Sequence, residues 1–149
     1  MQLRQCGVRG VFVMVSEQGA APTVVLDVSE DACIPIFIGL WEAISISQSL
    51  RGDVLSRPIT HDLFIELMNR YAIRLTALHI DAIDEGVFYA KLLFNGDHGK
   101  ESIDCRPSDG IAIALRANVP VCVEEDVIEK AGVDRKLLAD MRDVATYFN

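Results

Sequence analysis

The first part of the chain is patterned for β-strands, because runs rich in β-branched residues are broken by turn residues. The segment 17–22, which contains Gly19 and Pro22, separates the first two runs in the manner of a hairpin. Farther along, the segments 84–86 and 95–100 separate three more runs, which predicts an antiparallel meander. The expected strands are residues 8–16, 23–29, 32–39, 73–84, 87–95, 101–106 and 121–124.

Helical periodicity marks three longer segments and one short one. Residues 40–51 gather small and apolar side chains on one face and end at Gly52, a residue type that favours a helix C-terminus. A second helix is expected after Thr60 as its N-terminal cap, a third over 110–116, and a short one that ends at Gly132. The buried stripe of the second helix is expected to be Leu63, Phe64, Leu67, Met68 and Tyr71.

The last segment of the chain also has apolar side chains at helical intervals. They are Leu137, Leu138, Met141, Val144, Ala145 and Phe148. This spacing predicts a helical tail over 133–149 that covers either its own domain or a second subunit. Since antiparallel strands are interrupted by helices without regular βαβ units, we expect one α+β domain over 1–132, with a mixed, largely antiparallel sheet and helices packed on it.

Composition narrows the class of protein. A chain of 149 residues, half of them hydrophobic, is long enough for one domain with a real core. No apolar run approaches the roughly 20 residues that span a bilayer, and the first residues lack the apolar centre of a signal peptide, so we expect a cytoplasmic protein that does not bind membranes. The formal charge of −8 argues against a broad electrostatic surface for duplex nucleic acid, so a polyanion has to meet a local cluster of arginines. The spacing of the four cysteines favours free thiols over a zinc site or a disulfide framework.

The segment 103–109 puts charged groups where a strand gives way to a very apolar helix. Alternation along the strand places Asp104 and Arg106 on one face and Cys105 on the other. Ser108 or Asp109 is expected to cap the free N–H groups of the helix, which form a natural anion site. Such a cluster suits phosphate chemistry, and it equally suits an ordinary capped helix with a local ion pair.

Several separate stretches resemble the bifunctional nuclease domain. They are Ile34-Pro35-Ile36-Phe37-Ile38-Gly39 with Glu42-Ala43, Arg57-Pro58-Ile59-Thr60-His61-Asp62-Leu63, Phe88-Tyr89-Ala90 and Asp104-Cys105-Arg106-Pro107-Ser108-Asp109. The resemblance runs from about the first strand to Gly132 and leaves the tail unmatched. It implies an α+β fold, self-association and nuclease activity on both DNA and RNA. At Gly110 and Ile111 relatives often have alanine and leucine, which changes helix propensity and leaves the chemistry of the site alone.

The motif positions can be given chemistry one at a time. Glu42 suits either catalysis or a helix start, where the dipole favours a carboxylate. His61 beside Asp62 suits a general acid or base for a phosphodiester, or a satisfied surface imidazole. Asp104 and Asp109 can hold a divalent ion that polarises the phosphate, with an ion pair and a helix cap as the plain alternatives.

The arginines and the remaining polar groups complete the expected site. Arg57, Arg106 and Arg116 can bind phosphate and stabilise the transition state, or pair with the carboxylates. Ser108 is added as a substrate-binding hydroxyl, and Cys105 is set aside as a nucleophile because of its face.

These observations lead to one hypothesis and two rivals. The hypothesis is a homodimer or larger homo-oligomer that hydrolyses phosphodiester bonds of single-stranded DNA and RNA by water attack assisted by Mg²⁺ or Mn²⁺, with His61 as proton shuttle. The first rival is a regulatory module without catalysis that binds a phosphorylated ligand. The second is a structural oligomer whose charged strand end is an interface.

Overall fold

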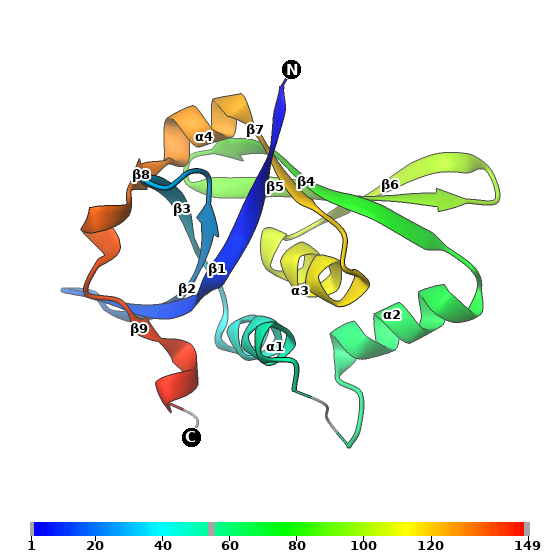
Figure 1. The fold of residues 1–149 in the computed structure, drawn as a ribbon, viewed down its shortest axis with the longest axis horizontal. Helices are drawn as coiled ribbons and strands as arrows, with labels where there is room; N and C mark the ends of the chain where they lie inside the picture. Colours follow the sequence, from blue (N-terminus) through cyan, green and yellow to red (C-terminus); the bar gives the residue numbers. More distant parts are fainter. Residues whose placement is uncertain (1, 54–55, 148–149) are drawn as a thin grey trace.

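The computed structural model describes residues 2–53 and 56–147, in which groups of β-strands are interrupted by helices (Figure 1). The strands are β1 (Leu3–Ser16), β2 (Gly19–Asp27), β3 (Ala32–Phe37), β4 (Arg74–Asp84), β5 (Val87–Gly96), β6 (Gly99–Cys105), β7 (Val121–Glu124), β8 (Val133–Asp134) and β9 (Arg142–Asp143). The α-helices are α1 (Leu40–Arg51), α2 (Thr60–Arg70), α3 (Pro107–Ala117) and α4 (Glu125–Ala131). Two 3₁₀ helices follow, η1 (Arg135–Leu138) and η2 (Val144–Tyr147).

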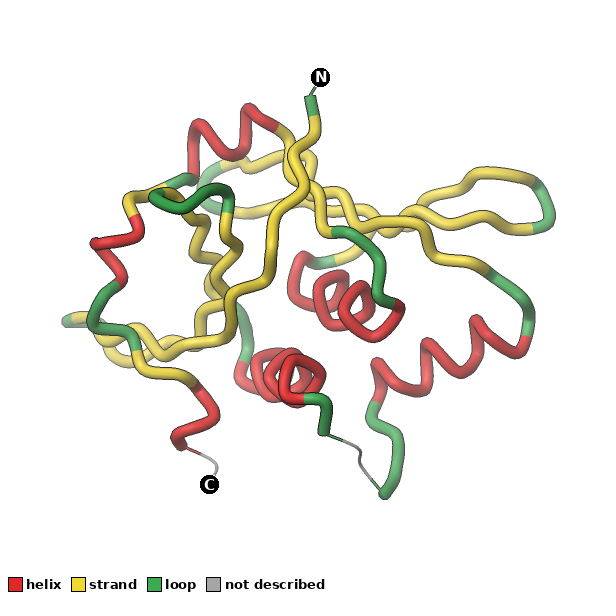
Figure 2. The backbone as a smooth tube through the Cα atoms, viewed as in Figure 1, coloured by secondary structure: helices red, strands yellow, loops and turns green. Residues whose placement is uncertain are grey.

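Within the described residues the nine strands form one sheet in the order β6-β5-β4-β7-β1-β2-β3-β8, and β9 pairs with β1. In this part of the chain β4 and β7 are the one parallel pair, and the other pairs are antiparallel. The long strand β1 joins the two halves of the sheet, β6-β5-β4-β7 and β2-β3-β8, because Leu3–Cys6 pair with β7 and the rest of the strand pairs with β2. Figure 2 shows the strands curving around helices, so the expected α+β fold with a largely antiparallel sheet is confirmed.

The helix α3 lies at the centre of the molecule and determines where the other helices pack. It contacts α1 and α2 on its sides and β4 and β5 of the sheet (Figure 1). Its residues Ile111–Ala114 are buried, and they meet Ile46 of α1 and Leu78 of β4 in one core. Fully burying a side chain of this size stabilises the fold by about 1.5–3 kcal/mol. Because α1 and α2 both pack on α3, the N-termini of α2 and α3 lie beside α1.

Of the expected helix ends, that of the first helix is confirmed and two expected caps are wrong. The first helix covers 40–51 as expected, and Gly52 ends it with a φ of 69°. Thr60 is the first residue of α2 and not its cap, because the carboxylate of Asp62 accepts the N–H of Ile59. The expected cap of α3 is also wrong, since Arg106 occupies the N-cap position and its side chain makes no capping bond.

The apolar stripe expected on α2 is only partly buried. Met68 is buried and Phe64 packs against the core. Leu63, Leu67 and Tyr71 are more than half exposed, so the expectation that they belong to the core is wrong. The helix turns one apolar edge inward and leaves a second one at the surface.

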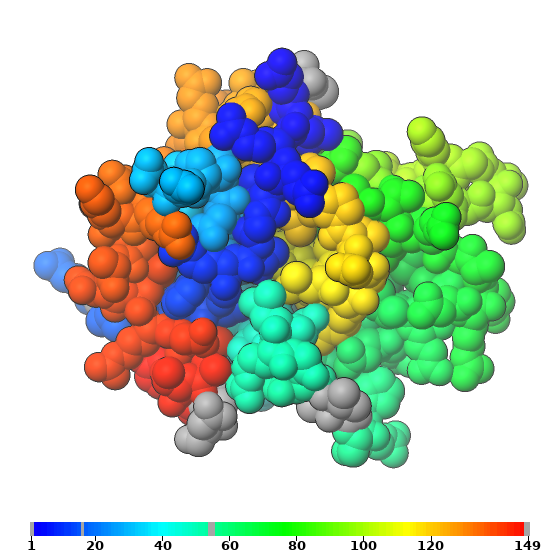
Figure 3. Space-filling view, in the orientation of Figure 1, coloured from blue at the N-terminus to red at the C-terminus, as the bar shows by residue number. Residues whose placement is uncertain are grey.

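The segment after Gly132 is not one continuous helix. It consists of β8, η1, β9 and η2, and β8 and β9 pair with β3 and β1. Leu138 and Val144 are buried, so the tail covers its own domain, as Figure 3 shows for the orange and red atoms beside the blue ones. Phe148 of the expected apolar series lies outside the described residues. The boundary at 132/133 stays a prediction.

Two further expectations concern the cysteines and the membrane. Cys6 and Cys33 are buried, Cys105 and Cys122 are half-buried, and all four are free thiols. Among the described residues no helix has the length and apolarity that crossing a bilayer requires.

Candidate active site

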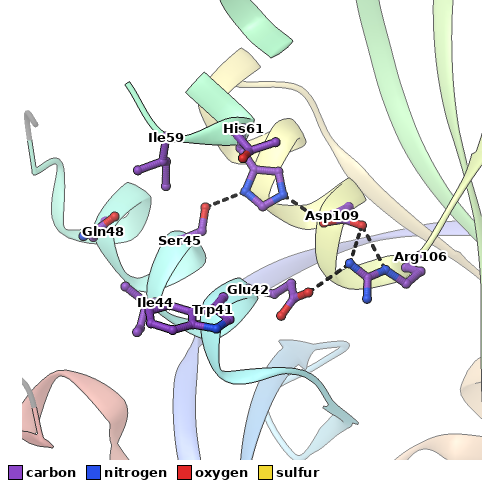
Figure 4. Close-up of a pocket in the computed structure, with 10 residues that line it drawn as sticks. Trp41, Glu42, Ile44, Ser45, Gln48, Ile59, His61, Arg106 and Asp109 are labelled. Atoms are coloured by element: carbon purple, nitrogen blue, oxygen red, sulfur yellow. Dashed lines mark hydrogen bonds and ion pairs between the residues drawn. The ribbon is translucent and has the colours of Figure 1, made fainter. Parts of the chain in front are cut away.

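The first turns of α1, α2 and α3 meet around a pocket of about 480 Å³ (Figure 4). Polar residues from all three helices line it beside an apolar wall. The lining residues are Trp41, Glu42, Ile44, Ser45, Gln48, Ile59, Thr60, His61, Arg106 and Asp109. The structure thus brings four of the expected residues into one place, namely Glu42, His61, Arg106 and Asp109.

The imidazole of His61 is hydrogen-bonded through both ring nitrogens. Nδ1 lies 2.6 Å from Oγ of Ser45, and Nε2 lies 2.9 Å from Oδ1 of Asp109 (Figure 4). The side chain of His61 is 12% exposed, so these two bonds fix the ring. An ionised carboxylate can only accept, so the neutral imidazole carries its proton on Nε2 and offers the lone pair of Nδ1 to the hydroxyl of Ser45.

The ionised form of Asp109 is favoured by its neighbours. Partial burial acts to raise its pKa, but hydrogen bonds from His61 and Arg106, together with their charges, outweigh burial and hold the pKa below its ordinary value. The carboxylate therefore remains an acceptor at neutral pH. A carboxylate in this position orients an imidazole and stabilises the imidazolium that forms when the ring takes a proton.

Arg106 bridges two carboxylates at the mouth of the pocket. Its Nε and Nη2 lie 3.0 and 2.9 Å from Oδ2 of Asp109, and Nη2 lies 2.9 Å from Oε1 of Glu42. The hydrogen bond and charge of Asp109, followed by those of Glu42, raise the pKa of the guanidinium. Among the described residues Nη1 has no partner, and the side chain is 67% exposed. Two N–H groups of this arginine thus remain available to an anion.

The carboxylate of Glu42 folds back over the start of α1. A Cβ built on Gly39, the N-cap of α1, would meet Oε2 of Glu42 at less than van der Waals distance. The absence of a side chain at position 39 therefore gives the carboxylate its place.

Asp62 and Arg116 lie behind the pocket and are paired with each other. Nε of Arg116 lies 2.7 Å from Oδ1 of Asp62, and its two terminal nitrogens donate to the carbonyl groups of Ala112 and Ser45. Burial acts to raise the pKa of Asp62, but the hydrogen bonds from Arg116 and from the N–H of Ile59 outweigh it and lower the pKa. These contacts tie α1, α2 and α3 together, so the pair positions the pocket from behind.

Three other expected residues lie apart from the pocket. Asp104 lies on β6 and lines a separate hollow with Lys91. Ser108 is buried near the start of α3 and lines the hollow that contains Phe37. Arg57 is exposed before α2 and, within the described part of the chain, has no ion-pair partner.

The expected pair of metal ligands does not fit a divalent ion as placed. Asp104 does not line the pocket of Asp109, and both carboxylate oxygens of Asp109 are engaged by His61 and Arg106. Across the described residues no three His, Cys, Asp or Glu side chains form a cluster that could hold a metal ion. The guanidinium of Arg106 lies between the carboxylates of Glu42 and Asp109 and neutralises both.

Sequence reasoning missed the polar and aromatic groups that α1 contributes. Ser45 shares a helix face with Glu42, and Trp41, Ser45 and Gln48 recur at intervals of three and four residues. This spacing was a usable signal, because it puts a reactive hydroxyl and an exposed tryptophan beside a motif glutamate. Cys105 was set aside because of its strand face, and burial raises the pKa of its thiol to about 11, which disfavours the thiolate.

Comparisons with known proteins agree with the motifs. The chain is 38% identical over 127 residues to an uncharacterized protein of Mycobacterium tuberculosis, an alignment that covers 85% of this chain and 76% of that protein. It is 27% identical over 138 residues to bifunctional nuclease 1 of Oryza sativa subsp. indica and 23% identical over 124 residues to bifunctional nuclease 2 of subsp. japonica. These alignments cover 89% and 80% of this chain and 38% of each rice protein. Residues 24–136 match the bifunctional nuclease domain, and the chain belongs to that family.

Proposed function

We propose that this protein is a nuclease that hydrolyses phosphodiester bonds of DNA and RNA in the pocket of His61. The observation that carries the proposal is the hydrogen-bonded series from Ser45 through His61 and Asp109 to Arg106 and Glu42, in a chain of the bifunctional nuclease domain family. The series combines a group that can move a proton with a cation that can bind phosphate. Both kinds of group accelerate phosphodiester hydrolysis.

Arg106 is the proposed phosphate ligand. Its Nη1 is available, and the guanidinium is held in place by Asp109 and Glu42. A preorganised cation next to the scissile phosphate stabilises the extra negative charge of the transition state. His61 accepts the proton of the attacking group, while Asp109 stabilises the imidazolium that results. Arg57 remains proposed as an outer phosphate contact.

Trp41 and Gln48 are the proposed base contacts. Trp41 is 78% exposed at the pocket, and an exposed indole offers a stacking surface worth about 1–3 kcal/mol per base. Gln48 also lines the pocket, and its Oε1 is buried without a hydrogen-bond partner among the described residues, so a base amino group can bond to this oxygen once the side chain turns into the pocket. A base can reach these groups only when it is unstacked from a duplex, which supports a preference for single strands.

The test compares single-stranded DNA and RNA oligonucleotides as substrates for the purified parent, His61→Ala and Arg106→Ala. Loss of the proton carrier or of the phosphate ligand is expected to lower the cleavage rate by about 10²-fold or more. The matched control is His98→Ala, because His98 lies in the turn between β5 and β6 and outside the pocket. Equal cleavage by the parent and His61→Ala, both folded, would remove the proposal.

The same assay, run with EDTA and then with Mg²⁺ or Mn²⁺ added back, tests the predicted metal assistance. It also separates the rival function. Cleavage that disappears on repeated chromatography, together with nucleotide binding that Arg106→Ala weakens, would favour a module that binds phosphorylated ligands without catalysis.

A further inference from the structure

The two hydrogen bonds of His61 restrict how this imidazole can act. Nε2 is committed to Asp109 and Nδ1 to Ser45, so neither ring nitrogen faces the pocket with a free position. A general base must reach the proton that it removes, directly or through one intervening group. The proton within reach of Nδ1 is that of the Ser45 hydroxyl, 2.6 Å away between heavy atoms.

We propose that Ser45 is the nucleophile of this pocket and that catalysis passes through a covalent phosphoserine intermediate. This inference rests on the proposed nuclease function and deepens it by naming the attacking atom. The hydroxyl, imidazole and carboxylate of Ser45, His61 and Asp109 are in the order of a hydrolase triad, with the roles of the two ring nitrogens exchanged.

The surroundings of Ser45 fit an activated hydroxyl. The residue is 2% exposed and lines the pocket, so its hydroxyl is shielded from bulk water. Its carbonyl oxygen accepts a hydrogen bond from Nη2 of Arg116, which is itself held by Asp62. Figure 4 shows the hydroxyl of Ser45 pointing from α1 toward the imidazole of His61. The backbone on one side and the imidazole on the other thus fix the position of Oγ.

An enzyme hydroxyl also suits the proposed pair of substrates. DNA lacks the 2′-hydroxyl that can attack the phosphate within RNA, so cleavage of both requires a nucleophile from the enzyme or from water. His61 has no free nitrogen for water while it holds Ser45 and Asp109. Attack by Oγ serves both polymers without rearranging these bonds.

The chemistry balances in two displacements. In the first, Oγ forms a bond to phosphorus and its proton passes to Nδ1 of His61, while the bond from phosphorus to the leaving nucleoside oxygen breaks on the opposite side and that oxygen takes a proton from a water molecule. In the second, the hydroxide left by that water attacks phosphorus, the bond from phosphorus to Oγ breaks, and Oγ regains its proton from Nδ1. One water is consumed, and Arg106 faces the charge at phosphorus in both steps.

The decisive measurement is the stereochemistry at phosphorus, made on the unaltered protein. An oligonucleotide with one phosphorothioate linkage of known configuration is cleaved in ¹⁸O-labelled water, and the configuration of the product is determined. Two in-line displacements give net retention, which is the expected result. Net inversion means a single attack by water and would overturn the role of Ser45.

Variants give an independent readout. Ser45→Ala is expected to lower the rate of the chemical step by on the order of 10³-fold or more, because the nucleophile is gone. Ser49→Ala, one turn along α1 and outside the lining of this pocket, is expected to stay within about twofold of the parent. A folded Ser45→Ala protein with parental activity would end the proposal. If that variant does not fold, the stereochemical result on the parent decides alone.

These outcomes separate the two levels of inference. An inactive His61→Ala variant together with net inversion, or with an active Ser45→Ala variant, would contradict the role of Ser45 as nucleophile. The proposed nuclease function would remain. If the parent is no more active than His61→Ala, both the role of Ser45 as nucleophile and the proposed nuclease function are wrong.

Discussion

Asp62 and Asp109 show how two neighbouring carboxylates take different tasks. Both have a lowered pKa because hydrogen bonds and positive charges outweigh partial burial. Asp109 faces the pocket and holds the imidazole of His61. Asp62 faces away from it and holds Arg116, whose side chain is 10% exposed. The first is expected to matter for the reaction and the second for the stability of the fold.

Asp62→Asn is predicted to lower the free energy of unfolding by about 1–2 kcal/mol at pH 7, through the loss of a charged acceptor for Arg116 and Ile59. A carboxyl whose folded-state pKa lies below its unfolded value of 3.8 stabilises the fold above that value. The difference between parent and variant should therefore be constant from pH 7 to about 5 and shrink as the pH falls below about 4. Urea denaturation across this range measures it.

The matched control is Glu66→Gln, which removes an exposed ion pair with Arg70 on the same helix. Such an i,i+4 pair is worth about 0.3–0.5 kcal/mol, so the variant should unfold almost with the parent at every pH. A difference for Asp62→Asn that is no larger than this, or one that grows as the pH falls, would contradict the structural role of Asp62.

At the scale of residues, the motifs predicted Glu42, His61, Arg106 and Asp109 as neighbours, and the structure brings them into one pocket. Asp104 was grouped with them because strand alternation gives the face of a side chain but not the path of the chain beyond the strand. Ser45 was missed because the sequence alone does not show which side chain lies next to a helical serine and could activate its hydroxyl. Its partner is His61, which comes from another helix.

Gly110 illustrates the contacts between elements. A Cβ at this position would lie 2.5 Å from Cδ1 of Leu78 and 3.0 Å from Sγ of Cys105, so the glycine lets α3 approach the sheet. Helix propensity alone suggests that alanine would fit better, by about 1 kcal/mol. The close packing seen here changes that interpretation, because the added methyl group would have to displace a fully buried leucine.

Gly110→Ala is predicted to destabilise the protein by about 1 kcal/mol net, since overpacking costs about 1–3 kcal/mol and the gain in propensity offsets part of it. Urea denaturation measures the change. A double-mutant cycle with Leu78→Ala isolates the contact, because the new methyl group then enters the space that the leucine left. Gly110→Ala should be less destabilising in that background than in the parent. If Gly110→Ala instead stabilised the parent, the overpacking against Leu78 would cost less than the gain in helix propensity, and the prediction would be wrong.

Helix ends and strands differ in how well the sequence predicted them. Residues 40–51 and 121–124 have the expected bounds, because Gly52 and Pro120 mark them locally. The expected cap of α2, Thr60, was wrong because Asp62 accepts the N–H of Ile59, and the expected cap of α3 was wrong because Asp109 bonds to His61 and Arg106 instead. The tail was expected to be a helix because its apolar spacing suits one, but pairing of β8 and β9 with the sheet takes precedence over local periodicity.

At the scale of the whole molecule, the exposed edge of α2 bears on self-association. Leu63, Leu67 and Tyr71 are spaced four residues apart, so they share one face, and they are 58%, 55% and 72% exposed. A continuous apolar face at the surface is typical of an interface. Homo-oligomerisation of this protein is a prediction, and a second copy of the chain packing the same face against this one is the arrangement that we expect.

Leu67→Glu is predicted to reduce the mass in solution from at least twice 16.4 kDa to that of one chain, because two copies would bury unpaired carboxylates at their contact. Light scattering after size exclusion, at two protein concentrations, measures the mass, and circular dichroism checks the fold. Leu137→Glu is the matched control, since Leu137 is 74% exposed on η1 and away from α2. A parent protein of 16.4 kDa would make self-association wrong. An oligomer that Leu67→Glu leaves intact would place the interface on another face, and the pocket of His61 would then have to be tested as part of that interface.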